Sequence, residues 1–130
     1  MVGIVVVSHS AKIAEGVCEL ASQMAGANQK ILAAGGMADG SIGTDAIRIS
    51  EAIESANTGE GVLVLVDLGS AIISTETALE IMSPELATQV VIADAPIVEG
   101  AISAAVQASI GASLSEVKEA AELAKAMQKI

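Results

Sequence analysis

The 130-residue sequence contains no phenylalanine, tyrosine or tryptophan. Aromatic rings are the surfaces on which nucleic-acid bases stack, so their absence argues against base stacking as a function. Basic side chains are also scarce, because six Lys and Arg residues face sixteen Asp and Glu residues and give a formal net charge of −10. Such a chain repels phosphate backbones and anionic lipid surfaces. We therefore expect neither a nucleic-acid partner nor a membrane partner.

Side chains that bind metals or form disulfides are almost missing. The chain has one cysteine, Cys18, and one histidine, His9. A single cysteine cannot form an intramolecular disulfide, and transition-metal sites need more such ligands than this sequence offers. The opening apolar run has no basic region before it and is far too short for a signal peptide or for a membrane span of about 20 residues. We therefore expect a cytoplasmic protein without a metal site.

Aliphatic residues, by contrast, are abundant and occur in short runs. Four runs predict β-strands: Val2 to Val7, Lys30 to Ala34, Val62 to Val66 and Thr88 to Ala93. The third run has no polar alternation, which is typical of a central parallel strand buried on both faces.

Helical spacing of apolar residues follows each run. Ser10 is predicted to cap the first helix, whose apolar stripe consists of Ile13, Val17, Leu20, Ala21 and Met24 and which ends at Gly26. Thr44 or Ser41 is predicted to cap the second helix, and the third starts near Ser70. A fourth runs from Ile97 and ends by Gly111, and Ser113 with Glu116 matches a capping box for a final helix.

The alternation of strands and helices predicts an α/β fold. Residues 1–130 fit one domain, because single domains commonly have about 100 to 150 residues. Parallel strands need crossovers of the length that these helices supply. We expect a doubly wound, mainly parallel sheet in the order 2-1-3-4 with helices on both faces.

His9 lies two residues after the end of the first predicted strand, and Asp67 directly follows the third. In the order 2-1-3-4 these strands are neighbours, and a crevice opens between their carboxyl ends. A carboxylate there can accept a hydrogen bond from one imidazole nitrogen and leave the other free as a nucleophile. His9 and Asp67 are therefore our candidate catalytic pair.

The crevice at the carboxyl ends of these strands is suited to a phosphoryl group. Ser10 and Ser70 begin helices whose first N–H groups point toward it, and Gly35, Gly36 and Gly69 allow close approach of the backbone. These donors and the helix dipoles would stabilise a phosphoryl group on His9 without a metal.

Simpler interpretations stay open for each residue. A histidine or an aspartate at a strand end is often only a turn residue with a local hydrogen bond. Gly35 and Gly36 are equally compatible with a plain turn, and Ser70 with a structural helix cap.

Five stretches together carry a resemblance to a known family. They are VVVSHSAKIAEGV at 5–17, IGTDA at 42–46, VDLGSA at 66–71 with ETALE at 76–80, and APIVEG at 95–100. In these stretches the chain resembles the phosphotransferase subunit of bacterial dihydroxyacetone kinases that use phosphoenolpyruvate. The relevant domain of that subunit is similar to the mannose-type IIA proteins of the sugar phosphotransferase system.

The resemblance implies that His9 accepts a phosphoryl group from the carrier HPr and passes it to ADP on a separate nucleotide-binding subunit. Asp67 matches the aspartate that lies near the histidine in the family, and Thr44, Gly69 and Ser70 fall in the stretches around it. The subunit would need no cofactor of its own, and it would form a homodimer.

Three alternatives remain. The first is a sugar-transport IIA component with the same chemistry and another acceptor. The second is a receiver-like regulatory module that is modified on Asp67 in place of His9. The third is an interaction module in which the crevice has no chemical role.

Overall fold

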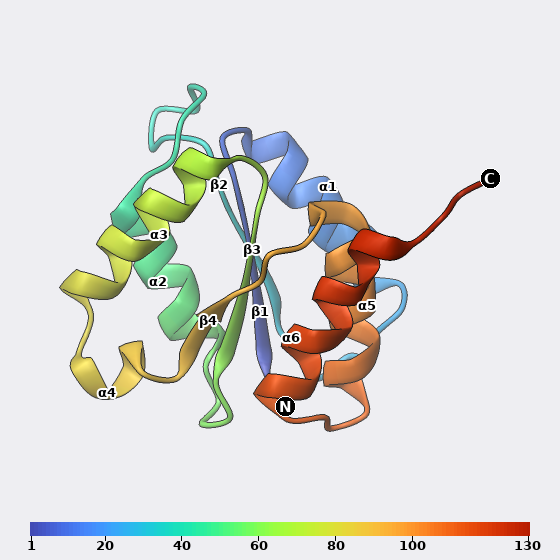
Figure 1. Ribbon diagram of the computed structural model, residues 1–130. Helices are drawn as coiled ribbons and strands as arrows, with labels where there is room; N and C mark the ends of the chain where they lie inside the picture. The colour runs from blue at the N-terminus through green and yellow to red at the C-terminus, as the bar shows by residue number, and fades with distance from the viewer.

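The computed structural model describes residues 1–130, and Figure 1 shows its four-stranded parallel sheet. The strands are β1 (Gly3–Ser8), β2 (Ile31–Gly35), β3 (Val62–Val66) and β4 (Val90–Ile92). Their order is β2-β1-β3-β4, and every pair is parallel. The predicted α/β class and the predicted strand order are both confirmed.

The two inner strands are the most deeply buried part of the sheet. β1 pairs with β2 on one side and with β3 on the other, and Val7 lies opposite Ala34 and Val66. All residues of β1 and β3 are buried. Continuous β-branched and leucine content suits strands covered on both faces.

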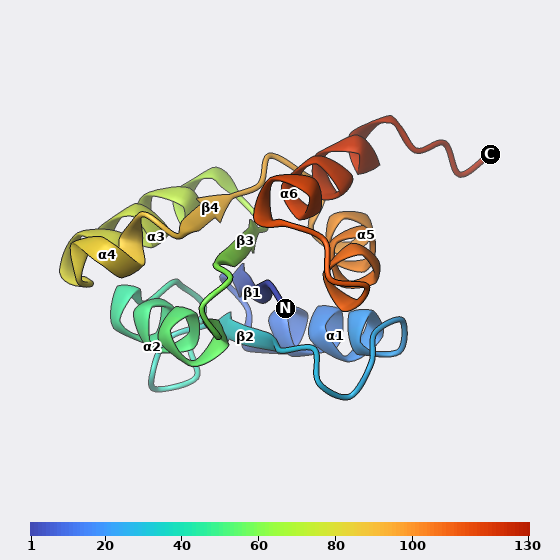
Figure 2. The same ribbon diagram turned by 90° about the horizontal axis from the view of Figure 1, so that it is seen from below.

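Helices cover both faces of the sheet, as the end view in Figure 2 shows. One layer contains α1 (Ala11–Ser22), α5 (Ile97–Ser109), α6 (Leu114–Leu123) and the short 3-10 helix η1 (Ala124–Ala126). The other contains α2 (Ala46–Ala56), α3 (Gly69–Ile81) and α4 (Pro84–Ala87). Each layer forms its own aliphatic core with the side chains that alternate strands project toward it.

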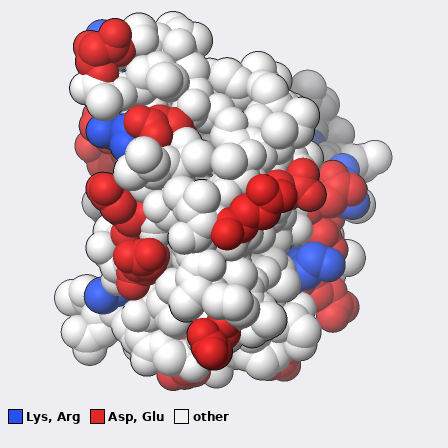
Figure 3. Space-filling model, turned by 90° about the vertical axis from the view of Figure 1, so that its left-hand side faces the viewer, with Lys and Arg blue, Asp and Glu red and all other residues white.

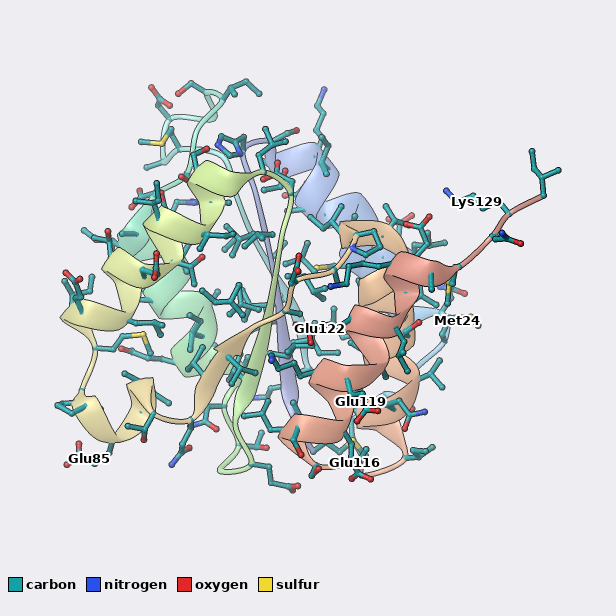
Figure 4. The ribbon with its side chains drawn as sticks, in the orientation of Figure 1. Met24, Glu85, Glu116, Glu119, Glu122 and Lys129 are labelled. Carbon is teal, nitrogen blue, oxygen red and sulfur yellow. The ribbon has the colours of Figure 1, made fainter.

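Two predicted helix caps are present. The Ser10 hydroxyl accepts a hydrogen bond from the Ile13 amide at the start of α1. Ser113 and Glu116 form the reciprocal capping box of α6, and Glu116 is labelled in Figure 4.

Other predicted boundaries were wrong. The cap of α2 is Asp45, whose carboxylate accepts from the Ile47 amide, and neither Thr44 nor Ser41 has that role. α1 already ends at Ser22, before Gly26. β4 is only three residues long, because Thr88 and Gln89 form a turn after α4 and Ala93 lies beyond the strand.

The predicted apolar stripe of α1 was also partly wrong. Ile13 and Leu20 are each 49% exposed and Met24 is 55% exposed (Figure 4), whereas the buried face consists of Ala14, Val17, Cys18 and Ala21. Small residues on the buried face let α1 lie close to β2. The closeness is visible at Gly35, where an added Cβ would lie 2.7 Å from the Ala14 Cβ. The larger side chains therefore face outward.

No helix of the structure combines the length and the apolar content that crossing a membrane requires.

Candidate functional site

The structure brings His9 and Asp67 together at the carboxyl edge of the sheet. β1 and β3 are adjacent and parallel, so the residues that follow them emerge side by side. The His9 Nδ1 atom lies 2.9 Å from Asp67 Oδ1. Both side chains are largely buried, with 21% of the His9 side chain and 14% of the Asp67 side chain exposed.

The Asp67 carboxylate accepts four hydrogen bonds, two on each oxygen. Oδ1 accepts from the His9 ring at 2.9 Å and from the Leu68 amide at 2.7 Å. Oδ2 accepts from the Ser8 hydroxyl at 2.9 Å and from the His9 amide at 3.0 Å. Burial by itself would raise the pKa of Asp67, but these donors together hold it below its usual value. Asp67 is therefore an anion with a fixed orientation.

This arrangement determines which nitrogen of a neutral His9 ring carries the proton. A carboxylate only accepts, so Nδ1 must donate to Asp67 and Nε2 is left with a lone pair. The Ser70 hydroxyl lies 2.6 Å from Nε2 and donates to it. In this tautomer Nε2 is the ring atom that is available to act as a nucleophile.

Ser70 is not the structural cap that one interpretation of the sequence offered. The cap position of α3 is Leu68, and its side chain makes no capping hydrogen bond. Ser70 lies inside the first turn, with its hydroxyl on His9. Gly69 before it is exposed and has open space where a side chain would be. The start of α3 thus presents first-turn amides without a side-chain acceptor, next to Nε2.

The other predicted glycines and Ser10 have different surroundings. Gly35 packs against the first residues of α1, with the Ser10 carbonyl 2.7 Å from the position of an added Cβ. The Gly36 amide donates to the Ser8 carbonyl at 3.1 Å and is not free for an anion. Gly36 has a φ of +70°, which favours glycine. The Ser10 hydroxyl is engaged as the cap of α1. These three residues therefore hold the end of β1 and the start of α1 in place on either side of His9 in the chain.

Thr44 makes no hydrogen bond to His9. Its hydroxyl is hydrogen-bonded to Ser74, one helical turn after Ser70 on α3. The neighbouring Gly43 amide donates to the His9 carbonyl at 2.9 Å. The loop between β2 and α2 is therefore hydrogen-bonded both to the His9 backbone and to α3.

Ser8 and Ser74 were missed as site residues. A signal existed for each of them: Ser8 directly precedes the histidine at a strand end, and Ser74 lies four residues after Ser70 and so on the same helix face.

The histidine lies on an open edge of the molecule. A cavity of about 380 Å³ is lined by Asp67, Leu68, Ile72 and residues 92–95, and another of about 310 Å³ lies between β2 and α2. Neither includes His9 in its lining. The contact between Nε2 and Ser70 is exposed, so another protein can reach this side of the partly buried ring.

Residues 3–118 match the family described as the fructose IIA component of the PTS system. The chain belongs to this family.

Two of its relatives are phosphoryl donor subunits DhaM of dihydroxyacetone kinases that depend on phosphoenolpyruvate. The chain is 48% identical over 120 residues to the subunit from Escherichia coli, with 90% of this chain and 25% of the relative covered. It is 45% identical over 113 residues to subunit DhaM of kinase 2 from Listeria innocua, with 87% and 90% covered. The chain therefore spans about a quarter of the first relative and most of the second.

Two solved structures share the fold. The crystal structure of a protein of unknown function, EF1359, superposes with a TM-score of 0.83 at 34% identity and covers 93% of this chain and 92% of that one. The phosphotransferase system component EIIA from Streptococcus agalactiae has a TM-score of 0.68 at 15% identity, covering 95% and 92%. The second likeness concerns the fold alone.

Proposed function

We propose that this protein is the phosphoryl relay subunit of a dihydroxyacetone kinase that uses phosphoenolpyruvate. His9 accepts the phosphoryl group from the carrier HPr and transfers it to ADP on the nucleotide-binding subunit of the kinase. The observation that carries the proposal is the 2.9 Å contact between His9 Nδ1 and Asp67 Oδ1, which places the proton of a neutral ring on Nδ1 and leaves the lone pair on Nε2. Relatives that are 45–48% identical and named as phosphoryl donor subunits support the choice of kinase.

The chemistry needs no proton transfer at Nε2. By the family resemblance, HPr carries its phosphoryl group on a histidine nitrogen. The Nε2 lone pair attacks the phosphorus, a new P–N bond forms, and the P–N bond to HPr breaks with its electron pair left on the HPr nitrogen. In the second step an oxygen of the ADP β-phosphate attacks, and the P–N bond of His9 returns its electron pair to Nε2. Asp67 stabilises the positive charge that the ring gains when it is phosphorylated.

The start of α3 supplies stabilisation for the transferred group. The Ser70 hydroxyl is already directed at Nε2, and the uncapped first turn at Gly69 and Ser70 offers backbone donors and the positive end of the helix dipole. Such donors can stabilise a phosphoryl group without a metal or a resident cofactor. In the proposed reaction ADP is held by the partner subunit.

Labelling with radioactive phosphoenolpyruvate tests this function. We expect the protein, mixed with Enzyme I and HPr, to gain an acid-labile label, and we expect His9→Ala to gain none. The variant should keep the circular dichroism spectrum of the parent, because the His9 side chain at a strand end contributes little to the core. Phosphoryl transfer by a folded His9→Ala variant would refute the assignment.

The acceptor is identified by a second incubation. We expect the ADP-loaded kinase subunit to remove the label from His9, whereas a sugar-transport IIB protein should leave it in place. The opposite result would favour the alternative role as a sugar-transport IIA component, which the family match also accommodates.

The receiver-like alternative has its own signature. A label on Asp67 would be an acyl phosphate, which is labile in base, whereas phosphohistidine is labile in acid and persists in base. The four hydrogen bonds on Asp67 leave neither of its oxygens free as a nucleophile, which favours His9.

We also propose that the protein forms a homodimer, by its likeness to the family. Sedimentation equilibrium tests this: a mass near twice the 12.9 kDa of the chain is expected, and a single-chain mass at all concentrations would contradict it.

A further inference from the structure

The hydroxyl of Ser8 is fully enclosed at the end of β1. A buried hydroxyl requires hydrogen-bond partners, and this one has two. It donates to Asp67 Oδ2 at 2.9 Å and accepts from the Ser10 amide at 3.1 Å. The Ser8 hydroxyl makes no hydrogen bond to the His9 ring.

The backbone of Ser8 is held as firmly as its side chain. Ser8 lies opposite Gly35 in the β1–β2 ladder, and its carbonyl accepts from the Gly36 amide at 3.1 Å. The hydroxyl therefore projects from a position that the sheet determines. It connects three parts of the site: the strand below His9, the start of α1 and the carboxylate after β3.

The orientation of the carboxylate depends on both oxygens. Oδ1 can face the His9 ring only while Oδ2 stays on the opposite side, where it accepts from Ser8 and from the His9 amide. Ser8 supplies the only side-chain donor to Oδ2. Removing it would leave Asp67 freer to rotate about its terminal torsion, which is broad for Asp.

We propose that Ser8 is a positioning residue for phosphoryl transfer, which acts by holding Asp67 so that the His9 proton stays on Nδ1. The inference rests on the proposed function of His9. A neutral imidazole without a partner on Nδ1 prefers to carry its proton on Nε2, where it blocks the nucleophile. Loosening Asp67 through Ser8 would therefore increase the inactive tautomer.

The experiment uses Ser8→Ala and a matched control, Ser50→Ala. Ser50 is also buried, and its hydroxyl donates to the Ile47 carbonyl in α2 at 2.8 Å, far from His9 in the sequence. Both substitutions remove one buried hydroxyl. Only the first removes a donor from Asp67.

Nitrogen NMR of the imidazole ring gives a readout that general destabilisation does not move. His9 is the only histidine, so protein labelled with ¹⁵N-histidine shows two ring signals. In mildly alkaline buffer we expect Ser8→Ala to shift both signals toward the tautomer with the proton on Nε2. We expect Ser50→Ala to keep the parent signals. Unchanged ring signals in a folded Ser8→Ala chain would overturn the inference.

The rate of labelling by phosphorylated HPr is the second measurement. We expect Ser8→Ala to be slower by about tenfold, the scale found when a hydrogen bond to a charged group is lost, and Ser50→Ala to be unchanged. An equal loss of rate in both variants would assign Ser8 a purely structural role. The NMR measurement needs no phosphoryl donor, so a failure of the parent to be labelled would refute the proposed function and leave the role of Ser8 to be decided by the ring signals.

Discussion

At the scale of single residues, the site depends on one carboxylate that is surrounded by donors. The Asp67 carboxylate accepts hydrogen bonds from Ser8 and His9 at the end of β1 and from the Leu68 amide that follows it in the chain. A protein that keeps a carboxylate so fully hydrogen-bonded stabilises its anion, and this lowers its pKa.

The lowered pKa of Asp67 predicts a pH dependence of stability. A carboxyl whose pKa is lower in the folded state than in the unfolded state binds its proton more weakly when folded, so it stabilises the fold above its unfolded pKa. This contribution should be fully present above about pH 5 and should be lost as the pH falls below about 4. Asp67→Asn removes it.

Urea unfolding at several pH values measures this effect. We expect the difference in free energy of unfolding between the parent and Asp67→Asn to shrink steadily as the pH is lowered. Glu119→Gln is the control, because Glu119 is exposed on α6 (Figure 4). A difference for Asp67→Asn that stays constant down to pH values near 3 would contradict the prediction.

At the scale of secondary-structure elements, the site depends on how closely α1 lies against β2. The close contact comes from small residues on both sides, because Gly35 meets Ala14 and the backbone at Ser10 and Ala11. α1 starts two residues after His9, so the position of the helix affects the position of the His9 backbone and ring.

Two glycine substitutions separate packing from helix propensity. Gly35→Ala would place a Cβ 2.7 Å from the Ser10 carbonyl oxygen, and we expect it to lower the free energy of unfolding by about 1–3 kcal/mol. Gly16→Ala lies in the middle of α1 with open space around it, and we expect it to raise stability by about 0.5–1 kcal/mol.

Urea unfolding followed by circular dichroism measures both variants, since the chain has no aromatic fluorophore. Gly35→Ala should also slow the phosphorylation of His9, and Gly16→Ala should leave it unchanged. If Gly35→Ala is as stable as the parent, α1 does not pack as tightly as the structure shows.

At the scale of the whole molecule, negative charge is spread over the surface. Figure 3 shows the face covered by α2, α3 and α4, where acidic groups outnumber basic ones and lie scattered between uncharged side chains. With a formal net charge of −10, these groups repel one another in the compact state. Only a few ion pairs offset this repulsion, among them the pair of Lys129 and Glu99.

This charge predicts a stabilising effect of salt. Because salt screens repulsion between exposed charges, we expect the urea midpoint at neutral pH to rise when sodium chloride is increased from about 0.01 M to about 0.15 M. Potassium chloride serves as a control for ion-specific effects and should act equally. A midpoint that falls with salt would show that the few ion pairs outweigh the general repulsion.

The fold class could be predicted from the sequence, and the order 2-1-3-4, expected because it is common among doubly wound sheets, is the one found in the structure. Unbroken aliphatic runs such as Val62–Val66 can be satisfied only by burial on both faces, and helices between them leave parallel pairing as the available arrangement. The same pattern identified the strand ends where His9 and Asp67 stand.

The finer details could not be predicted from the sequence, because they depend on distances between segments that are remote in the chain. Periodicity could not tell that α1 buries its alanines and exposes Ile13 and Leu20, since that depends on how near β2 approaches. It could not show that Ser70 turns its hydroxyl to His9 while Gly36 is engaged by Ser8. The orientation of Asp67 by a buried serine 59 positions away likewise exists only once β1 and β3 lie side by side.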